Sequence, residues 1–324
     1  MCYQLSNVVE IGVAERGSRI VLPNLFIAGA PKSGTTSLFR YLEQHDEIFM
    51  SRSKEPMYFI DNERYPQDIE WYESLFEEGR NATIRGDASN RYGACPYVCE
   101  RIRKDVPNPK FIFLLRNPIW RTWSHFRWAQ SLGFETRTIR TAYENSPDLV
   151  TIYSGERVGL FTNYAQESRY SEYIARYIEA FGRDNILIIT AEVLDSDPAK
   201  VLGKCTDFLG LPGFGDLSTI RTNVTPRAQY GRIYAILTGR THHDPIVRKL
   251  QVALGPVSSL GRRSRRLRTV MRHALNQSTG GWPARSLGSE DYEFLQRDLA
   301  GEVEQLRRLL TMSFDEWGAD FPGI

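Results

Sequence analysis

The sequence is poor in cysteine, has no long apolar run and carries almost no net charge. Four cysteines in 324 residues are too few for a disulfide framework, so we expect packed, free thiols and a reducing, cytoplasmic compartment. No stretch approaches the roughly 18 consecutive apolar residues of a membrane span, and the first residues lack the basic start and apolar run of a secretory signal. Forty-one basic residues oppose thirty-nine acidic ones, which gives no global reason to expect a nucleic-acid partner. A globular protein remains, whose ligands must be sought in local motifs.

Apolar runs and amphipathic stretches alternate along the chain. Short apolar runs bounded by turn residues predict buried strands over 24–28, 110–115 and 185–190. Apolar residues at helical spacing predict helices over 36–42, 119–130, 170–181 and 289–311. Phe314 and Trp317 follow the last helix, and we expect them to dock the C-terminus. This alternation indicates an α/β fold of three layers, with a central parallel sheet of about five strands flanked by helices. We interpret residues 1–324 as a single domain.

The segment after the first predicted strand has the form of a phosphate-binding loop. Gly29-Ala-Pro-Lys-Ser-Gly-Thr-Thr36 places two glycines at GxxxxG spacing between a strand and a helix, where backbone N–H groups and the helix N-terminus bind phosphate. Nucleotide kinases have a lysine directly after the second glycine, whereas here Thr35 stands there and the lysine is Lys32. Lys32 can therefore approach the oxygen that bridges the two acid groups of an anhydride. The residues expected to bind the ligand in this P-loop-like fold are Lys32, Ser33, Gly34, Thr35, Thr36 and Ser37.

Two strings carry a resemblance to a known family. AGAPKSGTTSLFRYLEQH and, further along, FLLRNPIWRTWSH resemble the two phosphate motifs of the sulfotransferases that use 3′-phosphoadenosine 5′-phosphosulfate (PAPS). The resemblance implies PAPS as the donor, no metal ion, and a 3′-phosphate held by Arg116 and Ser124. An arginine can bind phosphate oxygens through two N–H groups, and a serine adds one more bond. Arg121 and Arg127 have no part in this pattern, and we expect them on the surface.

A third segment supplies a candidate base. Ser51-Arg-Ser-Lys-Glu-Pro-Met-Tyr-Phe59 resembles the KEP-containing segment of heparan sulfate and bacterial carbohydrate sulfotransferases. The resemblance implies that Glu55 takes the acceptor proton and that Lys54 is an auxiliary cation near the transferred group. The similar small-phenol sulfotransferases use a histidine instead, which makes His125 and the pair His242-His243 alternatives. His45 stands at the end of the first predicted helix, where we expect it to cap that helix. Arg85-Gly-Asp-Ala-Ser-Asn-Arg-Tyr92 is similar to the family's G-E-x-S segment that lines the acceptor cleft, with Asp87 in place of glutamate, so Asp87 either assists Glu55 or orients loops.

Opposed blocks of charge lie behind the near-zero total. From Arg221 to Leu275, twelve basic residues face one acidic residue, whereas residues 286–324 hold three basic and nine acidic ones. We interpret residues 226–287 as an Arg-rich excursion of short helices and loops that covers the core. The arginines between Arg262 and Arg268 stay open to three interpretations: a solvated helix face, a part of the site that closes over an anionic donor, or a patch for a membrane surface or nucleic acid.

The resemblance covers most of residues 24–317 and implies an activity. The sequence lacks the cysteine-bounded Lys-Gly-Arg loop of the heparan enzymes, so the resemblance implies no heparan substrate. It implies transfer of a sulfuryl group from PAPS to a hydroxyl of a glycan, glycolipid or glycosylated small molecule, with release of adenosine 3′,5′-bisphosphate (PAP). The expected partner is that acceptor, with no nucleic acid and no membrane span, although peripheral membrane contact stays open. Two alternatives remain: a P-loop kinase that uses ATP and Mg²⁺, and a noncatalytic protein that binds nucleotides or polyanions.

Overall fold

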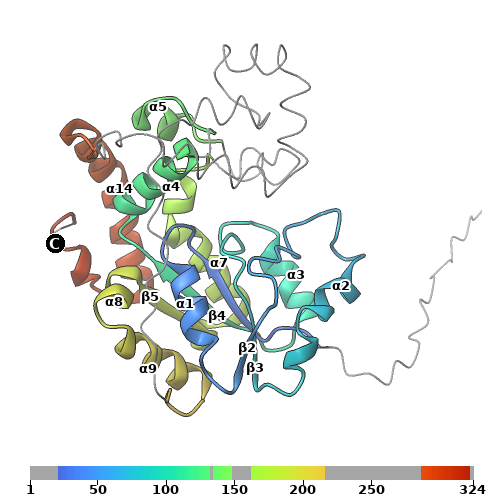
Figure 1. Ribbon diagram of the computed structural model, residues 1–324. Coiled ribbons are helices and arrows are strands. Elements are labelled where there is room, and N and C mark those ends of the chain that lie inside the picture. The colour runs from blue at the N-terminus through green and yellow to red at the C-terminus, as the bar shows by residue number, and fades with distance from the viewer. Residues whose placement is uncertain (1–20, 132–133, 148–161, 216–285, 322–324) are drawn as a thin grey trace, which may run out of the picture.

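A parallel five-stranded sheet forms the centre of the computed structural model (Figure 1), which describes residues 21–131, 134–147, 162–215 and 286–321. The strand order is β2-β3-β1-β4-β5, and each neighbouring pair is parallel. The strands are β1 (Leu25–Gly29), β2 (Ile48–Met50), β3 (Ile84–Asp87), β4 (Lys110–Leu115) and β5 (Ile186–Thr190). The order reverses between β1 and β4, so their carboxyl ends form the crevice in which open α/β sheets bind ligands. The predicted α/β fold is confirmed.

Helices cover both faces of this sheet (Figure 1). The α-helices are α1 (Thr35–Leu42), α2 (Ile69–Ser74), α3 (Val98–Asp105), α4 (Pro118–Ser131), α5 (Ile139–Glu144), α7 (Tyr170–Phe181), α8 (Ala191–Ser196), α9 (Pro198–Leu209) and α14 (Ser289–Leu310). The 3-10 helices are η1 (Glu77–Gly79), η3 (Gln166–Ser168), η4 (Arg183–Asn185) and η5 (Asp315–Trp317). The predicted strand 110–115 coincides with β4 and the predicted helix 170–181 with α7; the other predicted boundaries differ by one residue, which is ordinary at the ends of elements.

Alternate residues of the central strands face two separate apolar layers. On β4, Phe111 and Phe113 pack with the cluster that contains α3, α4, α7 and α14. Ile112 and Leu114 pack with the cluster that contains α1, α8 and α9. A strand buried on both faces needs apolar residues at every position, which is why β4 is an uninterrupted apolar run. The same run is what made this strand predictable.

The strands β2 and β3 were not evident as separate elements in the sequence. β2 has three residues, and β3 carries the charged residues Arg85 and Asp87. β3 lies between β1 and β2, and a Cβ atom at Gly86 would stand 2.3 Å from the sulfur of Met50. A side chain at position 86 would push the flexible end of Met50 aside. Tertiary pairing, which overrides local preference, forms the strand.

The C-terminal aromatic residues dock as predicted. The rings of Phe314 and Trp317 are stacked with centroids 4.4 Å apart, and both side chains are buried. The indole N–H of Trp317 donates to the Oε2 atom of Glu192 at 3.1 Å. A buried indole usually finds such a partner, so these contacts hold the end of the described chain against α8.

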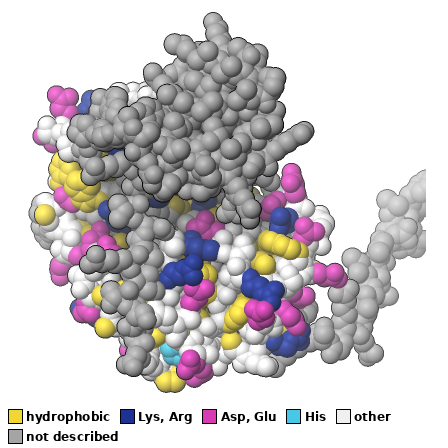
Figure 2. Space-filling model, viewed as in Figure 1, with side chains coloured by type: hydrophobic (Ala, Val, Ile, Leu, Met, Phe, Trp, Pro, Cys, Tyr) yellow, Lys and Arg dark blue, Asp and Glu magenta, His cyan; other side chains and the backbone are white. Residues whose placement is uncertain are grey.

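The structure also bears on the predictions for the cysteines, the Arg-rich excursion and the membrane. Cys95, Cys99 and Cys205 are free and buried, which confirms packed thiols. The Arg-rich excursion of residues 226–287, apart from its last two positions, lies outside the described residues, so its role stays a prediction. None of the described helices is long and apolar enough to span a membrane. Basic and acidic side chains are interspersed on the described surface seen in Figure 2.

Candidate active site

The loop between β1 and α1 follows a left-handed backbone path at two positions. Gly34, the N-cap of α1, has φ 91°, and Lys32 has φ 70°. Glycine adopts this conformation without steric cost, whereas a lysine there stores about 1 kcal/mol of strain. The N–H of Ala30 donates to the carbonyl of Leu114 at 2.8 Å, which ties the loop to β4. The predicted strand-loop-helix arrangement of a phosphate site is therefore present.

Ser33 is the clearest sign that this loop takes an anion. Its side chain is 1% exposed, and its Oγ atom has no hydrogen-bond partner within the part of the chain that the structure describes. A buried hydroxyl without a partner costs about 1–3 kcal/mol. Thr35 is buried beside it, and Thr36 and Ser37 are partly exposed at the start of α1. These hydroxyl groups fit a phosphate or sulfate group, whose oxygens would accept the missing hydrogen bond.

The ammonium group of Lys32 is held in a positive environment. Burial and the guanidinium group of Arg116 lower the pKa of Lys32 to about 8, while the carboxylate of Glu55 opposes them. The Nζ atom lies 5.4 Å from the centroid of the Trp128 ring, within the range of a cation–π contact. The charged form of Lys32 is therefore costly until a negative ligand stabilises it.

Arg116 and Ser124 belong to elements that meet at the same loop. Arg116 directly follows β4, and its guanidinium donates to the carbonyl of Lys32 at 3.4 Å. Its own carbonyl accepts a bond of 2.7 Å from the hydroxyl of Tyr170. Ser124 is partly exposed on α4, one turn before Trp128. Residues four apart share a helix face, so the face that carries Ser124 looks toward Lys32.

Glu55 lies in the loop after β2, with its carboxylate held at one oxygen. The Oε1 atom accepts hydrogen bonds from Lys54 and from the side-chain amide of Asn90, the latter at 2.7 Å. The side chains of Lys54 and Glu55 are 24% and 34% exposed, so the pair is reachable from solvent. Glu55 has φ 59° and Met57 φ 58°. Strained backbone of this kind clusters at functional sites.

Asp87 organises the segment that contains Glu55. Its carboxylate is fully buried and accepts hydrogen bonds from the hydroxyls of Tyr72 (2.6 Å), Tyr92 (3.0 Å) and Ser89 (2.7 Å), and from the N–H of Ser89 (2.9 Å). Burial raises the pKa of Asp87 to about 6, and these hydrogen bonds counteract the effect. The hydroxyl of Ser89 accepts from the N–H of Met57 at 2.9 Å. Of the two possibilities for Asp87, these contacts favour orientation of loops.

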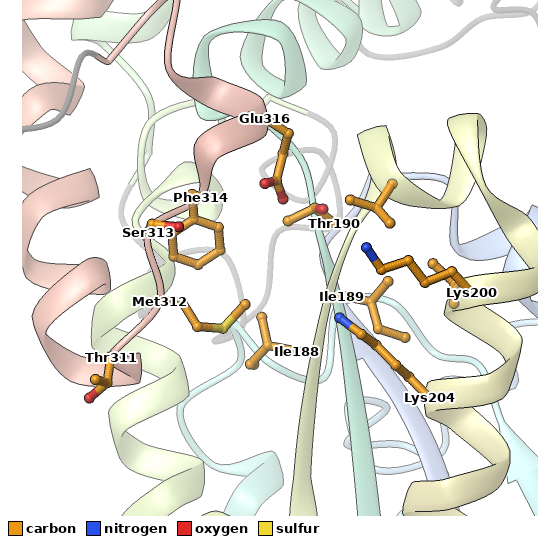
Figure 3. Close-up of a pocket in the computed structure, with 12 residues that line it drawn as sticks. Ile188, Ile189, Thr190, Lys200, Lys204, Thr311, Met312, Ser313, Phe314 and Glu316 are labelled. Atoms are coloured by element: carbon orange, nitrogen blue, oxygen red, sulfur yellow. The ribbon is translucent and has the colours of Figure 1, made fainter.

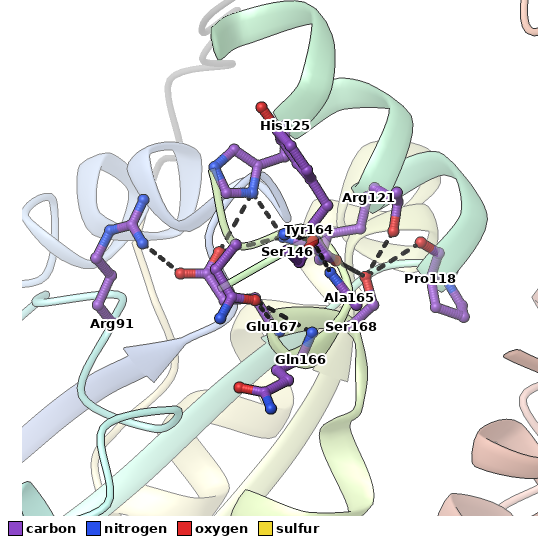
Figure 4. Close-up of polar contacts among 12 residues, drawn as sticks. Arg91, Pro118, Arg121, His125, Ser146, Tyr164, Ala165, Gln166, Glu167 and Ser168 are labelled. Atoms are coloured by element: carbon purple, nitrogen blue, oxygen red, sulfur yellow. Dashed lines mark hydrogen bonds and ion pairs between the residues drawn. The ribbon is translucent and has the colours of Figure 1, made fainter. Parts of the chain in front are cut away.

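A cluster of buried charges lies beneath the site (Figure 4). The carboxylate of Glu167 pairs with Arg91 and, at 3.3 Å, with Arg121. Burial raises the pKa of Glu167, and the two guanidinium groups oppose this effect. His125 lies 3.3 Å from the same carboxylate, so the structure places this alternative base in the interior. Within the cluster Arg121 also donates to the carbonyl of Tyr164 at 2.6 Å.

The expectation that Arg121 lies on the surface is wrong. Its side chain is fully buried, whereas Arg127 is partly exposed. A guanidinium group can be buried when each of its donors is paired. Ser168 and Glu167, on η3, are among the acceptors that satisfy Arg121. Because η3 is remote in sequence from α4, no local pattern predicted the burial of Arg121.

A cavity of about 360 Å³ lies elsewhere, beside the edge strand β5 (Figure 3). Lys200 and Lys204 of α9 line one side, and Met312 and Phe314 line the other. None of the predicted site residues lines it. The predicted site residues lie instead around the carboxyl ends of β1 and β4.

The sulfotransferase domain family matches residues 22–226, more than half of the chain. The chain belongs to this family. This sulfotransferase chain is 28% identical over 204 residues to the bifunctional heparan sulfate N-deacetylase/N-sulfotransferase 1 of Caenorhabditis briggsae, covering 61% of this chain and 24% of that protein. It is 28% identical over 193 residues to the human heparan sulfate glucosamine 3-O-sulfotransferase 6, covering 58% of this chain and 52% of that protein. The chain thus spans from about a quarter to about half of these curated relatives.

A solved structure shows the same fold as this sulfotransferase domain. The crystal structure of a sulfotransferase from Alicyclobacillus acidocaldarius aligns with a TM-score of 0.62 at 22% identity, covering 91% of this chain and 98% of that one. At this identity the likeness concerns the fold alone, and it confirms the sheet and helix layers predicted for the sulfotransferase.

Three residues of the site were not predicted from the sequence. Asn90 contacts Glu55, Trp128 contacts Lys32, and Glu167 binds the buried arginines. Asn90 lies within the Arg85–Tyr92 segment, so that motif already offered a usable signal. Trp128 lies one helical turn after Ser124, which is also a usable signal. No sequence signal pointed to Glu167, because its partners come from distant parts of the sulfotransferase chain.

Proposed function

We propose that this protein transfers a sulfuryl group from PAPS to a hydroxyl of a glycan, glycolipid or glycosylated small molecule and releases PAP. The observation that carries the proposal is the buried hydroxyl of Ser33, which has no hydrogen-bond partner among the described residues. It lies beside Lys32, whose ammonium interacts electrostatically with both Arg116 and Glu55. The loop proposed to bind an anion and the candidate base Glu55 therefore lie within electrostatic reach of each other. Membership of the sulfotransferase domain family supports the same reaction.

The donor-binding roles follow from the positions of the side chains. Ser33, Thr35, Thr36 and Ser37, with the backbone at Gly34, would bind the 5′-phosphate at the start of α1. Arg116 and Ser124 would bind the 3′-phosphate, because an arginine at a strand end offers two N–H donors to one phosphate. PAPS, when bound, supplies the sulfuryl group and a phosphate leaving group.

The chemical roles fall to Lys32 and Glu55. Lys32 stabilises the negative charge that develops on the bridging oxygen as it leaves, since an ammonium in a buried site interacts strongly with such charge. Glu55 accepts the proton of the acceptor hydroxyl, which makes the oxygen nucleophilic. Lys54 contacts Glu55, so we assign it to the orientation of that carboxylate in addition to its predicted role as an auxiliary cation.

Calorimetry with PAP, ATP and heparin tests the choice of donor. We expect PAP to bind tightly without magnesium, and ATP to bind weakly whether or not Mg²⁺ is present. Tight, magnesium-dependent binding of ATP with weak binding of PAP would instead identify a kinase. Binding of heparin that survives the change of both Lys32 and Arg116 to alanine, in a protein without transfer activity, would favour a noncatalytic polyanion-binding protein.

A transfer assay tests the reaction and the base. The protein is incubated with PAPS and p-nitrophenyl glycosides of glucose, galactose and N-acetylglucosamine, and mass spectrometry detects an added sulfuryl group. In Glu55→Gln we expect kcat to fall by a factor of about 10² to 10⁴, the usual contribution of a general base, with an unchanged affinity for PAP. Near-normal turnover of Glu55→Gln together with an inactive His125→Gln would transfer the assignment to the histidine.

A further inference from the structure

Two donors of different kinds converge on a single oxygen of Glu55. The ammonium of Lys54 and the side-chain amide of Asn90 both donate to Oε1, the amide at 2.7 Å. In the described part of the chain, Oε2 receives no hydrogen bond. A carboxylate held at one oxygen by two donors has a fixed orientation, and its second oxygen stays available to a further donor.

The two donors differ in how firmly the fold holds them. Lys54 belongs to the same loop as Glu55 and reaches it through a chain of four flexible bonds. Asn90 comes from the segment after β3, which packs across the end of β1. The N–H of Gly93 donates to the carbonyl of Ala28 at 2.7 Å, and a Cβ atom on Gly29 would lie 3.2 Å from the carbonyl oxygen of Asn90. Asn90 therefore has a fixed place relative to the phosphate loop.

The residues on either side of Asn90 strengthen this fixation. Ser89 is bound to the buried carboxylate of Asp87, and Arg91 is paired with the buried Glu167. The short side chain of Asn90 has two rotatable bonds and a planar amide, so little conformational freedom is lost when it binds Glu55. The amide of Asn90 is thus the rigid one of the two donors.

We propose that Asn90 is a positioning residue that locks Oε1 of Glu55 and leaves Oε2 to receive the proton of the acceptor hydroxyl. The inference rests on the proposed sulfuryl transfer with Glu55 as its base. In that reaction the hydroxyl proton moves to Oε2 and the hydroxyl oxygen forms a bond to sulfur. The bond between sulfur and the bridging oxygen breaks, and its electron pair remains on the 5′-phosphate of PAP. Asn90 touches none of the reacting atoms and acts through Glu55.

The test compares Asn90→Ala and Asn90→Asp with the exposed Asn81→Ala as a control. The probes are PAPS and whichever p-nitrophenyl glycoside gives the highest rate with the unchanged protein. We expect kcat to fall about tenfold in Asn90→Ala, the value of a hydrogen bond to a charged group. It should fall further, about hundredfold, in the isosteric Asn90→Asp, where a second carboxylate repels Glu55. In Asn90→Ala the affinity for PAP and the KM for PAPS should stay within about twofold, because this change adds no charge and leaves the donor-binding residues in place.

A double-mutant cycle separates positioning of the base from support of the fold. If Asn90 acts through Glu55, then Asn90→Ala adds no loss of rate to the residual activity of Glu55→Gln. Additive losses, full activity in Asn90→Asp, or a weaker affinity for PAP that parallels the loss of rate would each overturn the inference. Absence of transfer by the unchanged protein rejects the proposed function and the inference together, whereas an inactive Glu55→Gln beside a fully active Asn90→Ala rejects the inference alone.

Discussion

The hydroxyl of Ser89 accepts a hydrogen bond of 2.9 Å from the backbone N–H of Met57. Ser89 itself donates to the buried carboxylate of Asp87 at the end of β3, and Met57 lies two residues after Glu55. The position of the proposed base is therefore set by the sheet through two side chains. Tyr92 adds a second connection, because its hydroxyl accepts from the N–H of Phe59 at 3.3 Å and donates to Asp87 at 3.0 Å.

Binding of PAP at alkaline pH should be accompanied by proton uptake at Lys32. With its pKa lowered to about 8, Lys32 is largely neutral in the free protein at about pH 9. An anion bound beside it favours the charged form, so about one proton is taken up there and almost none at about pH 6.5. Calorimetry in buffers of different ionisation enthalpy measures this number.

Lys32→Arg is the matched control for that measurement. An arginine stays protonated at both pH values, so the variant should bind PAP without uptake. Equal uptake in Lys32→Arg and the unchanged protein would assign the proton to another group.

Arg116 should determine the preference for a 3′-phosphate. In Arg116→Ala we expect the affinity for PAP to fall about tenfold to hundredfold, the value of a charged hydrogen bond or two. The affinity for adenosine 5′-monophosphate, which lacks the 3′-phosphate, should change little. Ser124→Ala should show the same pattern to a smaller extent, and Arg127→Ala on the same helix serves as the control. Equal losses for both nucleotides would place Arg116 at the 5′-phosphate instead.

Asp87 should give stability a dependence on pH between about 4 and 6. Its folded-state pKa of about 6 lies above the ordinary value of 3.8, so the folded protein binds the proton more tightly than the unfolded chain. The stabilisation is complete below the unfolded pKa and is lost as pH rises through the folded one. Relative to Asp87→Asn, the free energy of unfolding should fall by about 3 kcal/mol between these limits. Urea unfolding at several pH values measures it, and a constant difference would contradict it.

Glu167 should be essential to the stability of the buried charge cluster. Glu167→Gln leaves Arg91 and Arg121 without their counter-ion in the interior, which should cost about 3–5 kcal/mol of unfolding free energy. Glu77→Gln, which breaks the exposed pair with Arg80, should cost less than about 1 kcal/mol. Thermal and urea unfolding of the two variants give the comparison. A similar loss of unfolding free energy in both variants would mean that water reaches the buried guanidinium groups.

Prediction from sequence succeeded wherever the signal was local. The apolar run of β4 and the GxxxxG spacing around Lys32 are statements about neighbouring residues, and both gave the right element in the right place. The apolar pattern did not predict β3, because two of its four residues are charged. No local signal predicted the burial of Arg121, because that burial depends on Glu167 and Tyr164, more than 40 residues away along the chain.

The sequence by itself determined the layers of the fold, the phosphate loop and the identity of Lys32, Arg116 and Glu55 as candidates, because hydrophobic period and motif spacing are properties of the chain. Only the tertiary structure decided which groups surround them. Asn90 meets Glu55, Trp128 meets Lys32, and the buried Asp87 accepts a hydrogen bond from Ser89. These contacts join β1, β3 and α4 at one end of a sheet, and the order of its strands, which no local pattern encodes, brings them together.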